Sequence, residues 1–198
     1  MFNWDLPRLA THPRIYNWLH TLRLVPEFTT TRPTELACLE DHAKGAKIAV
    51  EVGSYMGASA GRIASVLGSG GKCYCVDPYI RAEAMQAVCL RHLRRAGLMP
   101  RIVMLRMTGG EARLILPRQV DFIFVDGDHS WDGIRTDWAL VKECLRLGGK
   151  VCFHDTSPPP ERPTERCESV RFFDEVISQD AAFEQVETRA TLNVLRRR

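Results

Sequence analysis

The sequence predicts an α/β fold: a doubly wound sheet of seven strands, mostly parallel, with an antiparallel hairpin at its C-terminal end. Short apolar segments alternate with helical segments from residue 45 onward, which is typical of a parallel sheet covered by helices on both faces. The last two apolar segments, 183–188 and 191–196, are separated by only two residues, as in a hairpin. With 198 residues, 45% of them hydrophobic, the chain can form one well-packed domain.

Five apolar segments are predicted to form the parallel strands, because each is short, rich in β-branched or aromatic residues and bounded by residues that end a strand. They lie at 48–52, 72–76, 101–106, 120–125 and 150–153. Residues 1–33 are expected to form short helices broken by prolines, and residues 34–44 a helix that ends at Gly45.

The remaining helices are bounded by glycine or proline. Gly68 ends a helix at 58–67, Gly97 follows a helix at 81–96, Pro117 ends a short helix at 111–116, and Gly148-Gly149 ends a helix at 131–147. A proline-rich loop at 157–167 separates the fifth strand from a last helix at 169–178.

Composition limits the partners and the location of the protein. The net charge of +3 is too small to indicate nucleic acid, and no apolar run approaches the ~20 residues that span a membrane. The seven cysteines include no Cys-x-x-Cys pair, and the N-terminus does not read as a secretory signal. We therefore expect a cytoplasmic protein with reduced, buried thiols that binds neither nucleic acid nor membrane. The basic run at 91–95 is interpreted as a solvated helix face.

Polar residues gather where the parallel strands end, at the edge where such sheets bind ligands. The segment Glu51-Val52-Gly53-Ser54-Tyr55-Met56-Gly57-Ala58-Ser59 joins the first strand to its helix. Gly53 and Gly57 allow a tight turn and the close approach of a ligand. The segment is neither the Gly-x-Gly-x-x-Gly of dinucleotide binders nor a P-loop, and Glu51 suits a cationic or amine-bearing ligand better than a phosphate. Asp77, at the end of the second strand, can accept both hydroxyls of a ribose.

These motifs resemble the class I S-adenosylmethionine-dependent methyltransferases. The loop 51–59 is similar to their first motif, and Val76-Asp77-Pro78-Tyr79 to their ribose-binding segment. The segments 122–133 (FIFVDGDHSWDG) and 147–155 (LGGKVCFHD) are similar to a bacterial subgroup of small-molecule O-methyltransferases, related to the catechol O-methyltransferase-like and macrocin O-methyltransferase-like enzymes. The resemblance covers residues 45–196.

The resemblance implies a Rossmann-like fold, with residues 45–198 as the cofactor-binding core of a single domain, 1–198. Residues 1–44, which match no motif of the family, are expected to form a helical lid or cap. The residues expected to bind S-adenosylmethionine are Glu51, Gly53, Ser54, Tyr55, Gly57, Ser59, Asp77, Met107, Thr108, Asp126, His129 and Trp131. For Trp131, a place in the core is an equal alternative to packing on adenine.

Two routes to methyl transfer fit the residues at the strand ends. By the resemblance, Asp126, Asp155 and Thr156 would hold Mg²⁺, which orients the acceptor hydroxyl and lowers its pKa. In the other route His129 or His154 acts as general base, since imidazole titrates near neutral pH. The residues expected to be catalytic are Asp126, His129 and His154.

The function expected from these features is S-adenosylmethionine-dependent O-methylation of a small molecule, by an enzyme that could form a homo-oligomer. Two other functions stay open. A non-catalytic cofactor-binding or scaffold protein would keep the fold without the reaction. An NAD-dependent oxidoreductase would share the glycine loop and the ribose-binding acid, although the fingerprint of dinucleotide binders is incomplete. An RNA methyltransferase is disfavoured by the charge.

Overall fold

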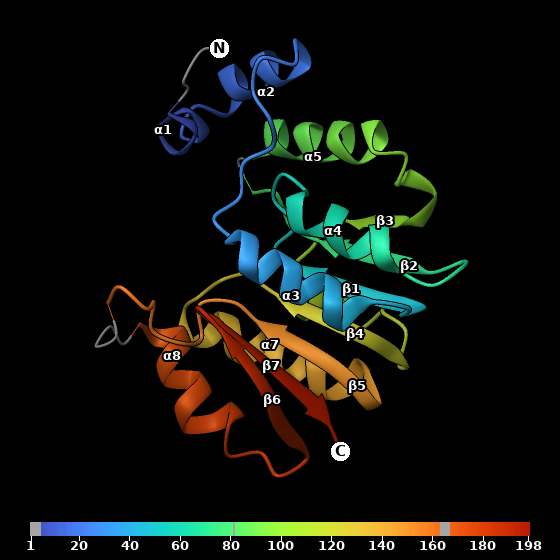
Figure 1. The fold of residues 1–198 in the computed structure, drawn as a ribbon, viewed down its shortest axis with the longest axis vertical. Coiled ribbons are helices and arrows are strands. Elements are labelled where there is room, and N and C mark those ends of the chain that lie inside the picture. The colour runs from blue at the N-terminus through green and yellow to red at the C-terminus, as the bar shows by residue number, and fades with distance from the viewer. Residues whose placement is uncertain (1–4, 81, 163–166) are drawn as a thin grey trace.

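A single seven-stranded sheet runs through the protein, and the computed structural model describes residues 5–80, 82–162 and 167–198 of it (Figure 1). The strand order is β3-β2-β1-β4-β5-β7-β6. The first five strands are parallel, and β7 pairs antiparallel with both β5 and β6. The predicted doubly wound sheet with a C-terminal antiparallel hairpin is therefore confirmed. The strands are β1 (Ile48–Val52), β2 (Lys72–Val76), β3 (Ile102–Leu105), β4 (Val120–Val125), β5 (Leu145–Phe153), β6 (Phe183–Arg189) and β7 (Leu192–Arg197).

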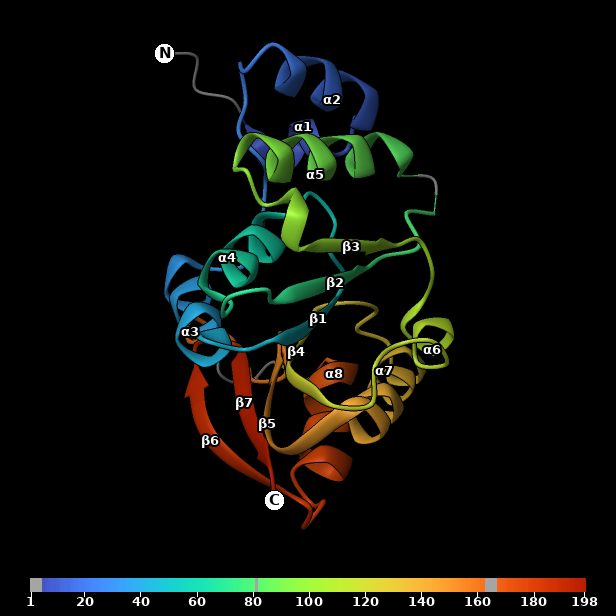
Figure 2. The same ribbon diagram turned by 90° about the vertical axis from the view of Figure 1, so that its right-hand side faces the viewer.

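Helices cover both faces of the sheet (Figure 2). On one face lie α3 (Pro33–Ala43), α4 (Ala58–Val66) and α5 (Glu83–Arg95), which pack side chains such as Leu39, Ile63 and Leu93 against the strands. On the other face lie α6 (Gly109–Ala112), α7 (Trp131–Cys144) and α8 (Glu168–Phe172), with Trp138 and Phe172 in the core. A short 3-10 turn, η1 (Met99–Arg101), precedes β3, and a π-helical turn, η2 (Phe173–Ile177), extends α8.

Three of the four N-terminal prolines lie in the first turn of a helix, and Pro26 lies in the segment between the second and third helices. Pro13 is the first residue of α2 (Pro13–Thr21) and Pro33 the first of α3, a position where the missing N–H costs nothing. With α1 (Leu6–Ala10), α2 lies beyond α5, and Tyr16 of α2 is fully buried there. The segment expected as a lid is thus split: α1 and α2 pack on α5, whereas α3 packs on the sheet and reaches the ligand-binding edge through Glu35 near its start.

The basic run on α5 holds the N-terminal helices and is not simply a solvated face. Arg95 donates hydrogen bonds to the carbonyl oxygens of His20 and Thr21 at the end of α2, each at 3.1 Å. Arg91 donates to the side chain of Asn17 at 2.9 Å. These bonds satisfy carbonyls that the end of a helix leaves unpaired.

Several element boundaries differ from the predictions, among them the end of α6, which lies at Ala112 and not at residue 116. Residues 145–147, expected in a helix, belong to β5: Val120 pairs with Leu145 and Phe122 with Lys150, so Gly148 and Gly149 lie in a bulge of that strand. Helix α6 begins two residues before the predicted start at 111, because Thr108 and Glu111 form a capping box. The start of α5 is at Glu83, and the predicted first residue, Arg81, lies outside the described residues.

Six of the seven cysteines are buried and Cys167 is exposed; all seven are free. None of the described helices has the length and apolar character that a membrane span requires.

Candidate active site

The glycine loop between β1 and α4 adopts a backbone that only glycine accommodates. Gly53 has φ +93°, and a Cβ there would lie 2.0 Å from the backbone oxygen of Asp126 at the end of β4. Gly57 has φ +84°, and a Cβ there would lie 2.7 Å from the sulfur of Cys89. Both positions confirm the prediction of a tight turn, and Gly53 also shows why the ends of β1 and β4 can approach each other.

Asp77 anchors this loop from the end of β2. One carboxylate oxygen accepts the N–H of Tyr55 at 2.8 Å, and the other accepts the N–H of Tyr79 at 2.7 Å. The Tyr79 hydroxyl in turn donates to the carbonyl of Tyr55 at 3.0 Å. Both tyrosines have positive φ, as does Asp155, so strained backbone gathers at this edge of the sheet. Asp77 is therefore held rigidly while its remaining lone pairs face the cavity described next.

A cavity of about 860 Å³ lies between this loop and the ends of β2, β3 and β4. Its volume is within the range of sites that bind small molecules and cofactors. It is lined by ten of the residues expected to bind the cofactor: Gly53, Ser54, Tyr55, Gly57, Ser59, Asp77, Met107, Thr108, Asp126 and His129. Thr29 and Thr30, which precede α3, close one side.

Glu51 and Trp131 are the expected cofactor residues that do not line this cavity. Glu51 is fully buried beneath it, near Ser54 and Ser59, and neither of its carboxylate oxygens has a hydrogen-bond partner in the described structure. Burial raises the pKa of Glu51 to about 7, although the two serine hydroxyls lower it. Trp131 packs edge-on against Phe172, with ring centroids 4.9 Å apart, and so belongs to the contact between α7 and α8.

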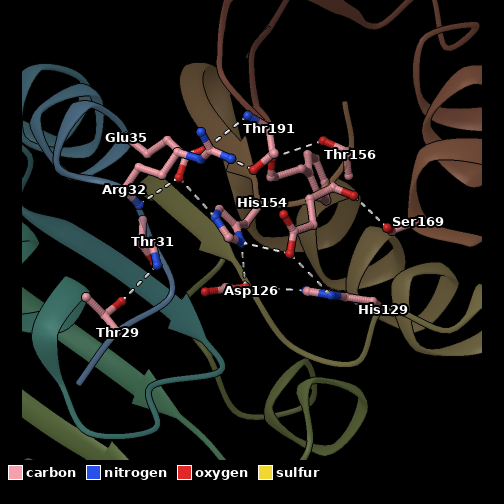
Figure 3. A network of polar contacts seen from close by, with 12 residues as sticks. Thr29, Thr31, Arg32, Glu35, Asp126, His129, His154, Thr156, Ser169 and Thr191 are labelled. Carbon is pink, nitrogen blue, oxygen red and sulfur yellow. Dashed lines mark hydrogen bonds and ion pairs between the residues drawn. The ribbon is translucent and has the colours of Figure 1, made fainter. Parts of the chain in front are cut away.

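A cluster of carboxylates surrounds His154 at the end of β5 (Figure 3). The ring Nδ1 lies 3.0 Å from Asp126 Oδ1 and 3.4 Å from Asp155 Oδ2, and Nε2 lies 3.2 Å from Glu35 Oε2. Burial alone lowers the pKa of His154, but these three carboxylates raise it far above the ordinary value of 6.5. A carboxylate at each nitrogen favours the doubly protonated ring, in which neither nitrogen has a lone pair free to accept a proton.

Glu35 belongs to this cluster although no sequence pattern pointed to it. It is fully buried, and it accepts hydrogen bonds from the backbone of Arg32 at 2.8 Å and from the backbone and hydroxyl of Thr191 at 2.9 and 2.8 Å. Burial raises its pKa, but these bonds and that from His154 outweigh the burial and lower it to about 2. The same balance lowers the pKa of Asp155 to about 2, with His154 as the main partner.

Of the two histidines in this cluster, His129 is exposed and His154 is buried. Its Nε2 lies 3.3 Å from Asp126 Oδ1, and its Nδ1 lies 3.7 Å from Asp155 Oδ2, which is beyond hydrogen-bonding distance. The hydrogen bond to Asp126 raises the pKa of His129 above 6.5. Asp126 thus lies between two imidazoles and fixes the orientation of both rings.

The residues present do not fit the expected magnesium site. Thr156 is buried. Its hydroxyl donates a hydrogen bond to the backbone oxygen of Phe153 at 3.0 Å and accepts one from the side-chain amide of Asn193 at 3.1 Å. Its oxygen is therefore engaged in the hairpin contact between β5 and β7, and it completes no ligand set with Asp126 and Asp155.

The two carboxylates of that set are already paired with His154. One ligand atom each of Asp126, His129 and His154 lies within 4.8 Å of the others, a spacing that a metal site can have. Both ring nitrogens of His154, however, already face carboxylate oxygens, at 3.0 and 3.2 Å, and a ring that donates to both offers no lone pair to a metal ion.

A smaller cavity of about 310 Å³ adjoins the larger one. His129 and Thr30 line both, so the two cavities meet at these residues. The smaller cavity is strongly polar: it is lined by Arg32, Glu35, His154, Asp155, Glu161 and Arg162, with Cys167 and Pro159 among the rest. Arg32 forms an ion pair with Glu161 across it.

Comparison with known proteins shows the family to which the chain belongs. Residues 50–156, just over half of the chain, match the family described as methyltransferase domain, and the protein belongs to that family. The match confirms the expected methyltransferase. A comparison with curated proteins finds no match.

Solved structures of methyltransferases share the fold. The O-methyltransferase from Bacillus cereus in complex with SAH superposes with a TM-score of 0.69 at 18% identity, over 94% of this chain and 90% of that one. The O-methyltransferase TomG from Streptomyces achromogenes, in complex with SAM, gives 0.68 at 17% identity over 93% and 88%. An rRNA methylase from Streptococcus thermophilus gives 0.61 at 13% identity over 86% and 99%. These likenesses confirm the class I methyltransferase fold.

Proposed function

We propose that the protein transfers the methyl group of S-adenosylmethionine to an oxygen atom of a small molecule. The observation that supports this most is the pair of adjoining cavities that meet at His129. The larger has the volume and the acidic residue that a nucleoside cofactor needs, and the smaller has room for a compact acceptor. The solved neighbours that carry SAM or SAH in their structures agree with this assignment.

The larger cavity fits S-adenosylmethionine by its chemistry. Asp77 would accept the ribose hydroxyls, because its carboxylate is fixed by two backbone N–H groups and borders the cavity. Ser54 Oγ borders the cavity and is buried without a partner, so it offers a polar group for the amino-acid end of the cofactor, and the buried carboxylate of Glu51 lies beneath it. When bound, the cofactor supplies an electrophilic methyl group on a positively charged sulfur, which suits an edge with this many carboxylates.

His129 would act as the general base. Its Nε2 hydrogen bond to Asp126 leaves Nδ1 free to take a proton from an acceptor hydroxyl at the junction of the cavities. Asp155, 3.7 Å from Nδ1, would stabilise the imidazolium that forms. Asp126 would position the ring. His154 would serve as a fixed cation that keeps Asp126 and Asp155 in place. This route needs no metal ion.

The acceptor would be small and polar. A cavity of about 310 Å³ is at the lower end of ligand-binding volumes, and its lining includes several charged side chains. A ribosomal RNA acceptor, as in one of the structural neighbours, would need a basic surface around this opening, whereas Arg32 here is paired with Glu161. A cytoplasmic location and a homo-oligomer stay predictions. Exposed apolar side chains around α2, such as Ile15 and Trp18, favour the second.

The test is methyl transfer from labelled S-adenosylmethionine to a panel of small hydroxylated acceptors. We expect turnover by the wild type, and a loss of at least about 100-fold in kcat for His129→Asn with little change in cofactor affinity. His12→Asn, at an exposed histidine remote from the cavities, is the matched control and should keep full activity. Cofactor binding without turnover of any acceptor would favour the alternative that the protein is a non-catalytic cofactor-binding or scaffold protein. Equal activity of His129→Asn and wild type would remove His129 from the mechanism.

A further inference from the structure

One acid in the wall of the larger cavity has no partner. Asp137 lies on α7, its residue is 5% exposed, and it lines the cavity. Within the described residues it makes no hydrogen bond or ion pair, whereas Asp77 and Asp126 at the same cavity each accept two. A buried carboxylate without a donor is costly, and in a native protein it calls for an explanation.

Two glycines make room for this carboxylate. A Cβ at Gly109 would lie 2.1 Å from Asp137 Oδ1, and a Cβ at Gly127 would lie 3.1 Å from Oδ2. Neither glycine has positive φ, so space and not backbone conformation makes a side chain unfavourable there. Gly109 begins α6 just after β3, and Gly127 follows β4. The carboxylate is therefore set into the wall between the β3 and β4 loops.

Under the proposed function, the other polar groups of the cavity each bind a different part of the cofactor. Asp77, at the end of β2, is the acceptor for ribose, and the β1 loop with Ser54 faces the amino-acid end. The loop after β3 remains for the base. The Thr108 hydroxyl is already engaged as both donor and acceptor, because it donates to Glu111 Oε2 at 2.8 Å and accepts the N–H of Glu111 at 3.3 Å. Asp137, against Gly109 in that loop, is the acid left to recognise a donor there.

Resting on the proposed function, we propose that Asp137 accepts a hydrogen bond from the exocyclic amine of adenine and so selects an adenine nucleoside. Adenine carries the one donor group of the cofactor that Asp77 and the glycine loop do not engage. An ionised carboxylate distinguishes that amine from a carbonyl at the same position, because it accepts hydrogen bonds from N–H groups and cannot donate one to a carbonyl oxygen. Burial raises the pKa of Asp137 to about 7, and a bound amine is the donor that would favour its ionised form.

The test compares S-adenosylhomocysteine with its inosine analogue, in which a carbonyl oxygen replaces the amine. Binding is measured by calorimetry on the full chain. The wild type should prefer S-adenosylhomocysteine by about 10-fold or more. Asp137→Asn is nearly isosteric and has an amide that can donate to the carbonyl, so the preference should shrink to a few-fold or reverse. Asp132→Asn is the matched control, because Asp132 lines the same cavity from the solvent-exposed face of α7.

The outcomes separate this inference from the proposed function. If the wild type and Asp137→Asn bind S-adenosylhomocysteine with the same preference over the analogue, the assignment of Asp137 is wrong while the cofactor stands. An equal loss of preference in Asp132→Asn would also overturn it, because the effect would then be general to the cavity. Binding of neither ligand by the wild type overturns the proposed function and this inference together.

Discussion

Replacement of His154 by glutamine should destabilise the folded protein, because it removes the cation from a buried cluster of three carboxylates. Glutamine is close to histidine in size, so little cavity forms, and it can donate to only one side. Glu35 is fully buried and Asp126 and Asp155 are half-buried, so the charges left behind are poorly solvated. Removal of one member of such a group costs about 3–5 kcal/mol. For a chain of this size that corresponds to a Tm lower by roughly 6 to 20 °C.

The cost should depend on pH in a defined direction. Glu35 and Asp155 have folded pKa values below their ordinary values of 4.5 and 3.8, so their stabilisation is present above that range and is lost as the pH falls toward 2. The pKa of His154 is raised from 6.5, so its stabilisation is complete below pH 6.5 and declines as the pH rises. The difference in unfolding free energy between wild type and variant should therefore be largest at pH 4.5–6.5 and should narrow as the pH falls from 4.5 toward 2.

The assay is urea denaturation of wild type and His154→Gln at pH 6 and pH 3.5. His12→Gln, at an exposed histidine, is the control and should stay within about 0.5 kcal/mol of the wild type. A cost below about 1 kcal/mol at pH 6, or a cost that is the same at both pH values, would refute the view that His154 is the counter-charge of this cluster.

Two further predictions concern the loop and the metal. Gly53→Ala should abolish S-adenosylhomocysteine binding and lower the unfolding free energy by about 2 kcal/mol or more, since its Cβ would meet Asp126 O at 2.0 Å. Gly70→Ala, with φ +72° and no atom within 4 Å of its Cβ, should cost only about 1 kcal/mol, and equal losses in both variants would contradict the steric argument. Chelation with EDTA should leave methyl transfer unchanged, and added Mg²⁺ should not raise the Tm of the S-adenosylhomocysteine complex. Activity that is lost with EDTA and restored by Mg²⁺ would show that Asp126 and Asp155 release His154 and bind the ion.

The fold was predictable because its signals are local. Each parallel strand is an apolar run closed by a polar residue or glycine, and alternation with helices allows little besides a covered parallel sheet. The sequence does not predict that β5 starts at Leu145, because Gly148-Gly149 has the pattern of a helix end. The pairing of Leu145 with Val120, which makes these residues a strand, is a contact between distant parts of the chain. The early start of α6 was within reach, since Thr108 and Glu111 have the spacing of a capping box.

The candidate site was predictable only where it follows the strand ends. Gly53, Asp77 and Asp126 lie at the edge that the topology specifies. Glu35 could not be found this way, because it reaches His154 from 119 residues away in the chain. Asp137 is an acid in a helical run, and nothing local marks it as buried.

Thr156 shows where spacing misleads. It follows Asp155 directly, but both residues lie beyond the end of β5, and Asp155 has φ +50°, so the chain turns between them. Its side chain therefore turns into the contact with β7, while Asp155 faces the cavities.

The most direct test of the account is a thermal-shift titration with S-adenosylhomocysteine, with NAD as the comparison ligand. At a hundredfold excess over Kd, a ligand that binds only the folded state stabilises it by about 2.7 kcal/mol, or roughly 5 to 10 °C in Tm here. We predict that shift for the wild type and for Asp174→Asn, an exposed control, with S-adenosylhomocysteine alone, and a shift at least halved for Asp77→Asn. No shift with S-adenosylhomocysteine, or a larger one with NAD, would contradict the central claim that this cavity binds S-adenosylmethionine.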